Sequence, residues 1–229
     1  MNGRETILAR IREALKAPAP HPASHGAHAP HGAASEHGPD AFRHWLPPVG
    51  DSPDDRLALF AKNSEALKTT FVVCESPAAA AAHATRIASA EAWKKVAAHR
   101  SPLVESVLGD FPDVLFTDGG FETAALEACD AGFTTCECLV AQTGSALVSS
   151  RDNGGRALSV LPPHHIIVAT RSQLLPDLSA AFELVESKYG GNFPSMLSFI
   201  TGPSRTGDIE RILVLGAHGP KNLTILLLP

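Results

Sequence analysis

Residues 52–74 read SPDDRLALFAKNSEALKTTFVVC, and this stretch decides the fold because it joins one helix directly to one short apolar strand. Ser52 is a favoured helix-capping residue and Pro53 suits the first turn, so a helix is predicted from there to about Lys68. The aromatic and β-branched run Phe71–Cys74 is typical of a buried strand. The stretch therefore predicts one helix–strand unit of an α/β protein.

The same unit recurs along the chain. Helices are predicted from Ser76-Pro77 to about Ala90, from Ser101-Pro102, and over Phe121–Ala128 and Pro176–Lys188. The predicted strands are Trp93–Ala97, Val114–Thr117, Cys136–Ala141, Ser145–Ser149, Ala157–Leu161, His165–Thr170, Met196–Thr201, Ile209–Leu215 and Leu223–Leu228. Helices alternating with short apolar strands indicate an α/β fold with a mainly parallel sheet and helices on both faces.

The chain before this region divides into two parts. Residues 1–17 carry Ile7, Leu8, Ile11 and Leu15 at helical spacing, which predicts an N-terminal amphipathic helix. Residues 18–50 are rich in His, Pro and Ala and read as a linker, because such a composition buries little apolar surface. Its six histidines are irregularly spaced, which favours a linker over a metal site. Residues 51–229 form the predicted α/β domain.

Composition excludes several classes of function. The net charge is −5 with no block of Lys or Arg, which argues against a nucleic-acid-binding protein. No run approaches the ~20 apolar residues that a membrane span requires. The N-terminus lacks the apolar segment of a secretory signal. A cytoplasmic protein is expected.

Four cysteines occur, at positions 74, 129, 136 and 138. Cys136 and Cys138 would place both sulfurs on one face of a strand. A second pair, which a structural zinc or iron–sulfur site needs, is missing. Buried reduced thiols are therefore expected, and no metal site is predicted.

Polar clusters interrupt the apolar strands of the second half of the chain. Arginine and histidine suit an anionic ligand, and ligands of open α/β sheets collect at the carboxyl ends of the strands, where we expect the site. The alternative is that these clusters are ordinary turns and caps. The clusters are Gln142-Thr143-Gly144-Ser145, Gly154-Gly155-Arg156, Pro162-Pro163-His164-His165, Ser204-Arg205-Thr206-Gly207-Asp208 and Gly216-Ala217-His218-Gly219-Pro220.

Taken in order, these clusters resemble the LUD domain family, and more narrowly its lactate utilization protein C (LutC/YkgG) type. The segments that carry the resemblance lie within residues 141–144, 156–166, 201–210 and 215–220, and the similarity covers roughly residues 55–229. The resemblance implies a Rossmann-like α/β sheet with a smaller β element. This fold is similar to that of the ribose-phosphate isomerase, glucosamine-phosphate deaminase and CoA-transferase group (NagB/RpiA/CoA-transferase-like).

The resemblance also implies site residues by position. Candidate catalytic residues are His165, His218 and Asp208, with His165 or His218 as the expected proton acceptor. Candidate substrate-binding residues are Thr143, Gly144, Arg156, Ser204, Arg205, Thr206 and Gly219. The family usually has Glu where this chain has Gln142, and an amide cannot act as a carboxylate base or nucleophile. Glu137 offers a carboxylate nearby, at a spacing that is not equivalent.

The function implied is that of a component of a complex that oxidises L-lactate to pyruvate. The chain would bind a small carboxylate or phosphate, would carry no cofactor of its own, and would work with iron–sulfur and cysteine-rich subunits. Two alternatives stay open. One is a non-catalytic assembly subunit, and the other is a stand-alone isomerase or CoA transferase. The ligand, the chemical step and any homo-oligomer are also left open.

Overall fold

The structure is a computed structural model that describes residues 3–14, 48–109, 111–206, 214–216 and 218–229. The chain separates into two compact units, Met1–Leu46 and Pro47–Pro229. In the first unit, helix α1 covers Gly3–Ala14 and carries the exposed side chains of Ile7 and Leu8. Residues 15–47 lie outside the described part, and with them almost all of the predicted linker.

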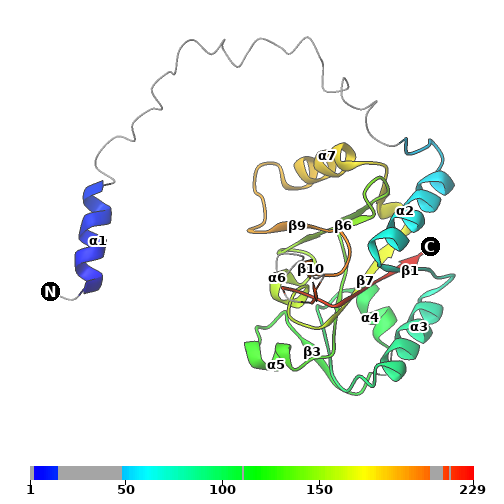
Figure 1. Cartoon of the computed structure of the whole chain (residues 1–229), viewed down its shortest axis with the longest axis horizontal. Coiled ribbons are helices and arrows are strands. Elements are labelled where there is room, and N and C mark those ends of the chain that lie inside the picture. Colours follow the sequence, from blue (N-terminus) through cyan, green and yellow to red (C-terminus); the bar gives the residue numbers. More distant parts are fainter. Residues whose placement is uncertain (1–2, 15–47, 110, 207–213, 217) are drawn as a thin grey trace, which may run out of the picture. The chain divides into compact units, whose positions relative to one another are not determined.

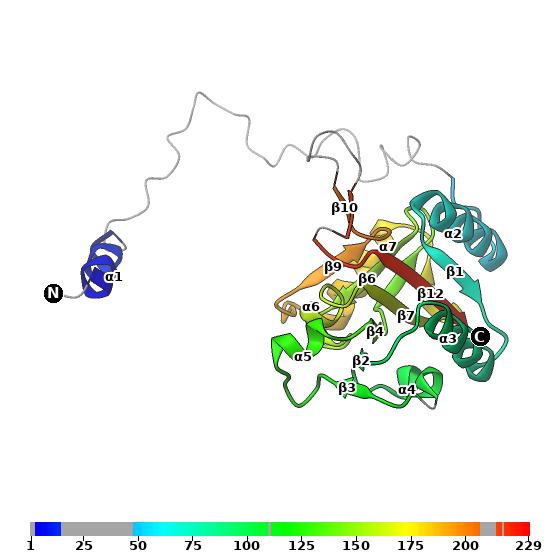
Figure 2. The same ribbon diagram turned by 60° about the horizontal axis from the view of Figure 1, so that its bottom comes forward.

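The second unit (Figure 1) is built on a sheet of six parallel strands in the order β1-β12-β7-β4-β2-β3, which can be followed in Figure 2. The strands are β1 (Thr70–Val73), β2 (Val96–Ala98), β3 (Val114–Phe116), β4 (Ala131–Thr134), β7 (His164–Thr170) and β12 (Asn222–Leu228). The predicted α/β fold with a parallel sheet is confirmed.

The smaller β element is a four-stranded mixed sheet in the order β8-β5-β6-β9. Its strands are β5 (Cys138–Val140), β6 (Ser145–Ser149), β8 (Leu174–Leu175) and β9 (Leu197–Ile200). A separate antiparallel pair joins β10 (Arg205–Thr206) to β11 (Val214–Leu215).

The helices begin where the capping signals lie. Ser52 caps α2 by accepting a hydrogen bond from the backbone N–H of Asp55, and Ser76 caps α3 in the same way through Ala79. Asp177 caps the last helix. The helices of this unit are α2 (Pro53–Leu67), α3 (Pro77–Ala90), α4 (Pro102–Leu108), α5 (Thr123–Glu127), α6 (Gly155–Leu158) and α7 (Leu178–Tyr189), with a 3₁₀ turn η2 (Arg171–Gln173).

Different elements cover the two faces of the six-stranded sheet. Helices α3 and α4 pack on one face, where Phe133 and Leu226 are buried. On the other face, α2 and the smaller sheet cover β12 and β7, while α5 and α6 lie over β2. Helix α7 covers the far side of the smaller sheet. The main sheet is thus buried on both faces, which explains its continuous apolar strands.

Three local predictions are corrected. Ala157–Leu161, predicted as a strand, begins in helix α6 and continues in turns. Strand β4 was not predicted, because Gly132 weakens the strand pattern. Cys136 and Cys138 do not share one environment, since they belong to different hydrophobic clusters on two sides of the smaller sheet.

The four cysteines are free and buried, as expected. Burial raises the pKa of the Cys138 thiol to about 12, so it stays protonated near neutral pH. Among the described residues, no group of three or more His, Cys, Asp or Glu side chains is placed to hold a metal ion. Within the same residues, no helix combines the length and apolar character that crossing a bilayer requires.

Candidate functional site

One cavity brings together five of the residues predicted from sequence. It has a volume of about 380 Å³, and we call it the Arg156 cavity. Its lining includes Arg156, His165, Ser204, His218 and Gly219. These residues come from segments that are far apart in the sequence. The fold brings them together around one cavity, as predicted.

The Arg156 cavity lies at the amino ends of two central strands. His165 is the second residue of β7, and Leu223, which also lines the cavity, is the second residue of β12. Residues of β9 form another part of the wall. The expected location at carboxyl ends of the parallel strands therefore does not hold for this cavity.

Two loops are joined to form one side of the cavity. The backbone N–H of Ser204 donates to the carbonyl of Pro220 at 2.8 Å, and that of Gly216 donates to the carbonyl of Ser204 at 2.9 Å. A Cβ at Gly219 would lie 3.2 Å from the Cβ of Ser204, so glycine permits this close approach. Ser204 is thus held in place by backbone hydrogen bonds to Pro220 and Gly216.

His165 is the buried polar group of this cavity. It is 1% exposed, and a hydrogen bond of 2.8 Å joins its Nε2 to the hydroxyl of Thr134. Its Nδ1 is buried and has no hydrogen-bond partner among the described residues. Burial lowers the pKa of His165 to about 3, with a further contribution from His164. The imidazole is therefore neutral near pH 7, which suits a hydrogen-bonding role better than the proton acceptor expected from sequence.

Arg156 and His218 are the remaining predicted residues with a polar side chain in the lining of the cavity. Both side chains are exposed, and Arg156 makes no ion pair with another described residue. The exposed guanidinium of Arg156 and the buried Nδ1 of His165, neither of which has a side-chain partner among the described residues, together match a small anion with one or two oxygen acceptors.

Thr143 and Gly144 lie elsewhere, in the turn between β5 and β6. The side-chain amide of Asn63 on α2 donates to the carbonyl oxygens of Ala141 and Gln142. Gly144 has φ +66°, and a Cβ there would lie 2.9 Å from the Cβ of Asn63. This turn holds the smaller sheet against α2, and its residues do not line the Arg156 cavity.

The remaining candidates are also separate from the lining. Arg205 and Thr206 form β10, where the Arg205 side chain is exposed. Neither residue is part of the lining described for the cavity. Asp208 lies outside the described residues.

A second polar cavity was missed by the sequence reading. It has a volume of about 610 Å³, and we call it the His99 cavity. It is lined by His99, Arg100, Ser101, Pro102, Thr117, Asp118, Ser150, Arg151, Asp152, Gly154 and Gly155. The signal was present in the sequence, because His99 follows β2 directly and Thr117 follows β3 directly.

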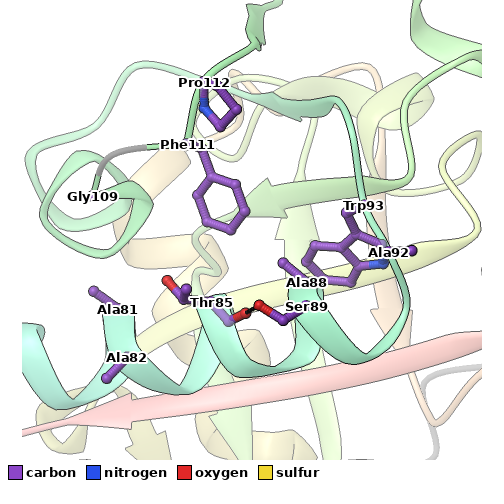
Figure 3. A pocket seen from close by; sticks show the side chains of 10 residues that line it. All are labelled: Ala81, Ala82, Thr85, Ala88, Ser89, Ala92, Trp93, Gly109, Phe111 and Pro112. Carbon is purple, nitrogen blue, oxygen red and sulfur yellow. Dashed lines mark hydrogen bonds between the residues drawn. The ribbon is translucent and has the colours of Figure 1, made fainter.

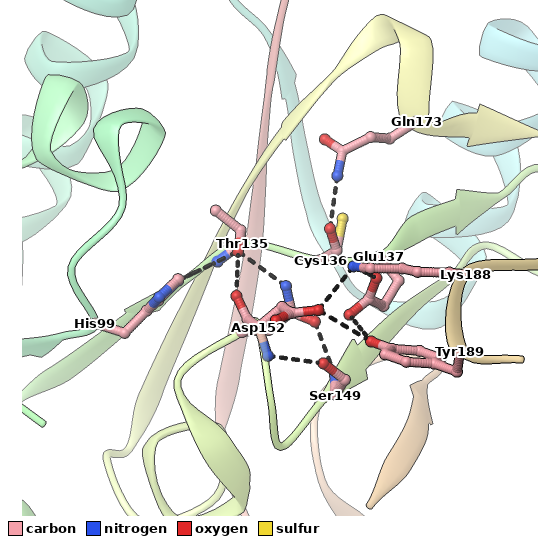
Figure 4. A network of polar contacts seen from close by, with 10 residues as sticks. His99, Thr135, Cys136, Glu137, Ser149, Asp152, Gln173, Lys188 and Tyr189 are labelled. Atoms are coloured by element: carbon pink, nitrogen blue, oxygen red, sulfur yellow. Dashed lines mark hydrogen bonds and ion pairs between the residues drawn. The ribbon is translucent and has the colours of Figure 1, made fainter. Parts of the chain in front are cut away.

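A network of polar contacts connects this second cavity to α7 (Figure 4). Lys188 donates to Glu137 at 2.6 Å and forms an ion pair with Asp152 at 2.8 Å. The hydroxyl of Tyr189 donates to Glu137 at 2.7 Å. The hydrogen bond from Lys188 lowers the pKa of Asp152. Glu137, the nearby carboxylate noted in the sequence, is therefore buried and hydrogen-bonded to Lys188 and Tyr189. It is not part of the lining of either polar cavity.

A third cavity, of about 510 Å³, lies between α3 and the segment after α4 (Figure 3). Trp93 and Phe111 face it together with small residues of α3. Its described lining contains no charged side chain.

Residues 121–228 match the LUD domain family. The chain is 36% identical over 96 residues to lactate utilization protein C 1 of Bacillus mycoides, an alignment that covers 41% of each chain. It is 33% identical over 103 residues to lactate utilization protein C of Bacillus subtilis, covering 44% of this chain and 43% of the relative. These alignments thus span less than half the length of these curated relatives.

The fold is also found in a crystal structure of a DUF162 family protein from Deinococcus radiodurans. The two structures superpose with a TM-score of 0.63 at 22% sequence identity, covering 79% of this chain and 100% of the other. This likeness supports the fold assigned above.

Proposed function

We propose, on the premise that residues 121–228 are a LUD domain, that this chain acts in lactate utilization and binds a small carboxylate in the Arg156 cavity. Relatives named lactate utilization protein C support the pathway. The observation that carries the site is the buried Nδ1 of His165, which has no partner among the described residues and borders the cavity that Arg156 also lines.

The chemistry of the cavity fits a 2-hydroxy or 2-oxo acid such as lactate or pyruvate. Arg156 offers a planar pair of N–H donors that matches a carboxylate. Neutral His165 carries one ring proton, and a bound anion would favour the tautomer with that proton on Nδ1. Ser204 and His218 can then contact the oxygen on the second carbon. A buried unsatisfied nitrogen costs folding free energy, and a bound ligand would remove that cost.

The electron-transfer step is assigned to partners in this proposal. The described residues hold no cluster of metal ligands. Iron–sulfur and cysteine-rich subunits, as the family resemblance implies, would accept the electrons. This chain would bind and orient the acid within a cytoplasmic complex.

Replacing Arg156 with alanine is expected to weaken lactate and pyruvate binding by about ten- to a hundredfold, because a charge-assisted hydrogen bond contributes about 1.5–3 kcal/mol. Isothermal titration calorimetry of the full chain measures this. Arg171→Ala removes another exposed arginine, which lies on η2 away from the Arg156 cavity, and should leave binding unchanged. Equal affinities of Arg156→Ala and wild type for both acids would exclude this site.

A second candidate function, assembly of partner subunits, is favoured by α1. The Ile7 side chain is 61% exposed and that of Leu8 is 38% exposed, on a helix of twelve residues. Such apolar side chains suit a groove on a partner protein.

The double substitution Ile7→Glu with Leu8→Glu is therefore expected to abolish capture of co-expressed iron–sulfur and cysteine-rich partners, because it places two charges on the apolar side of the helix. Affinity purification with quantification of each partner measures the effect. Glu5→Gln with Arg12→Gln keeps the apolar residues and serves as the control. Undiminished capture by the Glu double variant would rule out α1 as the docking element.

A further inference from the structure

The His99 cavity lies where parallel α/β sheets most often bind ligands. The chain passes from β2 outward to β3 and then returns to β4 on the opposite side of β2. At such a reversal the connections leave the sheet in opposite directions, and a crevice opens at the carboxyl ends of the strands. His99 and Arg100 follow β2, which borders this reversal, and Thr117 and Asp118 follow the neighbouring β3, so the cavity lies at the carboxyl ends of these two strands.

A chain of hydrogen bonds behind the cavity holds His99 in place. The backbone N–H of Thr135 donates to Nε2 of His99 at 3.1 Å, and Asn153 donates to the hydroxyl of Thr135 at 2.9 Å (Figure 4). Asn153 in turn accepts from the backbone N–H of Ser149 at 2.8 Å. A Cβ at Gly154 would lie 3.0 Å from the Cβ of His99, so this loop closes directly on the imidazole.

These contacts also determine which ring nitrogen of His99 carries the proton. Because Nε2 accepts a hydrogen bond from a backbone N–H, a neutral ring must carry its proton on Nδ1. Burial lowers the pKa of His99, although the Asp118 carboxylate opposes this effect. His99 therefore offers a preorganised neutral N–H donor, on a side chain that is 5% exposed.

Other groups around the cavity are available to a ligand. Ser101 precedes α4 but makes no capping hydrogen bond with its side chain. The Arg100 side chain is 64% exposed, lies over the Phe116 ring at 4.0 Å, and has Glu105 as a distant ion-pair partner at 3.7 Å. One oxygen of Asp118 is held by the backbone N–H of Arg100 at 2.8 Å. Guanidinium donors and a carboxylate acceptor thus border the same space.

From this arrangement we propose that the His99 cavity is a second ligand site, which binds a phosphate ester that also carries hydroxyl groups. The guanidinium groups of Arg100 and Arg151 would contact the phosphate. The carboxylates of Asp118 and Asp152 would accept hydrogen bonds from sugar-type hydroxyls. The cavity, at about 610 Å³ against about 380 Å³ for the Arg156 cavity, suits a ligand larger than lactate. Sugar phosphates and nucleotides share this chemistry.

Calorimetry on the full chain with four probes tests the proposal: ribose 5-phosphate, AMP, ribose and inorganic phosphate. We expect ribose 5-phosphate or AMP to bind more tightly than either ribose or inorganic phosphate. Tighter binding of AMP would identify a nucleotide site, and tighter binding of ribose 5-phosphate a sugar-phosphate site. Failure of both phosphate esters to bind at millimolar concentration would overturn the proposal.

Paired variants separate the two sites. Arg100→Ala should weaken phosphate-ester binding by about tenfold or more and leave lactate binding unchanged. Arg156→Ala should do the opposite. His99→Gln, read by the same titration and checked for folding by circular dichroism, tests the contribution of His99. Loss of phosphate-ester binding in Arg156→Ala but not in Arg100→Ala would refute the assignment to the His99 cavity, whatever happens to lactate.

Discussion

Lowering the pH from 6.5 to 4.5 is expected to reduce the free energy of unfolding by on the order of 2 kcal/mol through His165 alone. The folded pKa of His165 is about 3, whereas the usual histidine value is 6.5. Above pH 6.5 neither state binds the extra proton, so the contribution is constant. Below it the unfolded chain takes up a proton that the folded chain does not, and stability falls until the pH reaches about 3. The full effect would be on the order of 5 kcal/mol.

Urea unfolding at several pH values measures this effect as a slope. Between pH 6 and pH 4 the free energy of unfolding of wild type should fall by about 1.4 kcal/mol more per pH unit than that of His165→Gln. The variant removes the titration of this one group and leaves the other groups in place. His218→Gln, which alters an exposed histidine of the same cavity, should keep the wild-type slope. An NMR titration gives an independent reading. If the His165 resonance titrates near pH 6, the explanation from burial is wrong.

Gly132→Ala is expected to destabilise the protein by about 3 kcal/mol. Gly132 is buried in β4, and a Cβ there would lie 2.6 Å from the backbone carbonyl of Leu158 and 3.1 Å from the Pro162 ring. A backbone atom cannot rotate away as a flexible side chain can. The substitution must therefore displace the end of α6, the helix that carries Arg156, so lactate binding should weaken as well.

Chemical denaturation monitored by circular dichroism measures this change, and calorimetry measures the binding. Gly119→Ala is the matched control, because a Cβ at Gly119 would meet nothing within 4 Å. That variant should fall within about 0.5 kcal/mol of wild type. Wild-type stability of Gly132→Ala would show that α6 is not packed on β4 as described.

Local signals were enough to predict most helices and the class of the sheet. Ser52-Pro53 and Ser76-Pro77 mark helix starts because a serine side chain and a proline both satisfy the geometry of the first turn. Ala157–Leu161 was predicted wrongly because a short apolar run does not distinguish a strand from a helical turn. Strand β4 was missed because it contains Gly132. A glycine is needed there because Leu158, which lies far along the chain, leaves no room for a Cβ.

Contacts between residues far apart in the sequence also limited how well the candidate site could be predicted. The convergence of Arg156 and His165 was expected from the order of the polar clusters, and both line one cavity. Thr143 and Gly144 were grouped with them, but their turn packs on Asn63 of α2, a contact that has no local signal. The polar residues directly after β2 and β3 are a local signal for the His99 cavity, but their proximity depends on the order of the strands in the sheet, which successive elements do not reveal.

The position of β12 has a consequence for synthesis on the ribosome. Strand β1 lies at the edge of the sheet beside β12, and Thr70 is paired with Thr224, 154 positions later (224 − 70). While the nascent chain is emerging, β2, β3, β4 and β7 can associate in order, but β1 must wait for β12 before it can join them. Until then its unpaired backbone is open to chaperones and to wrong partners.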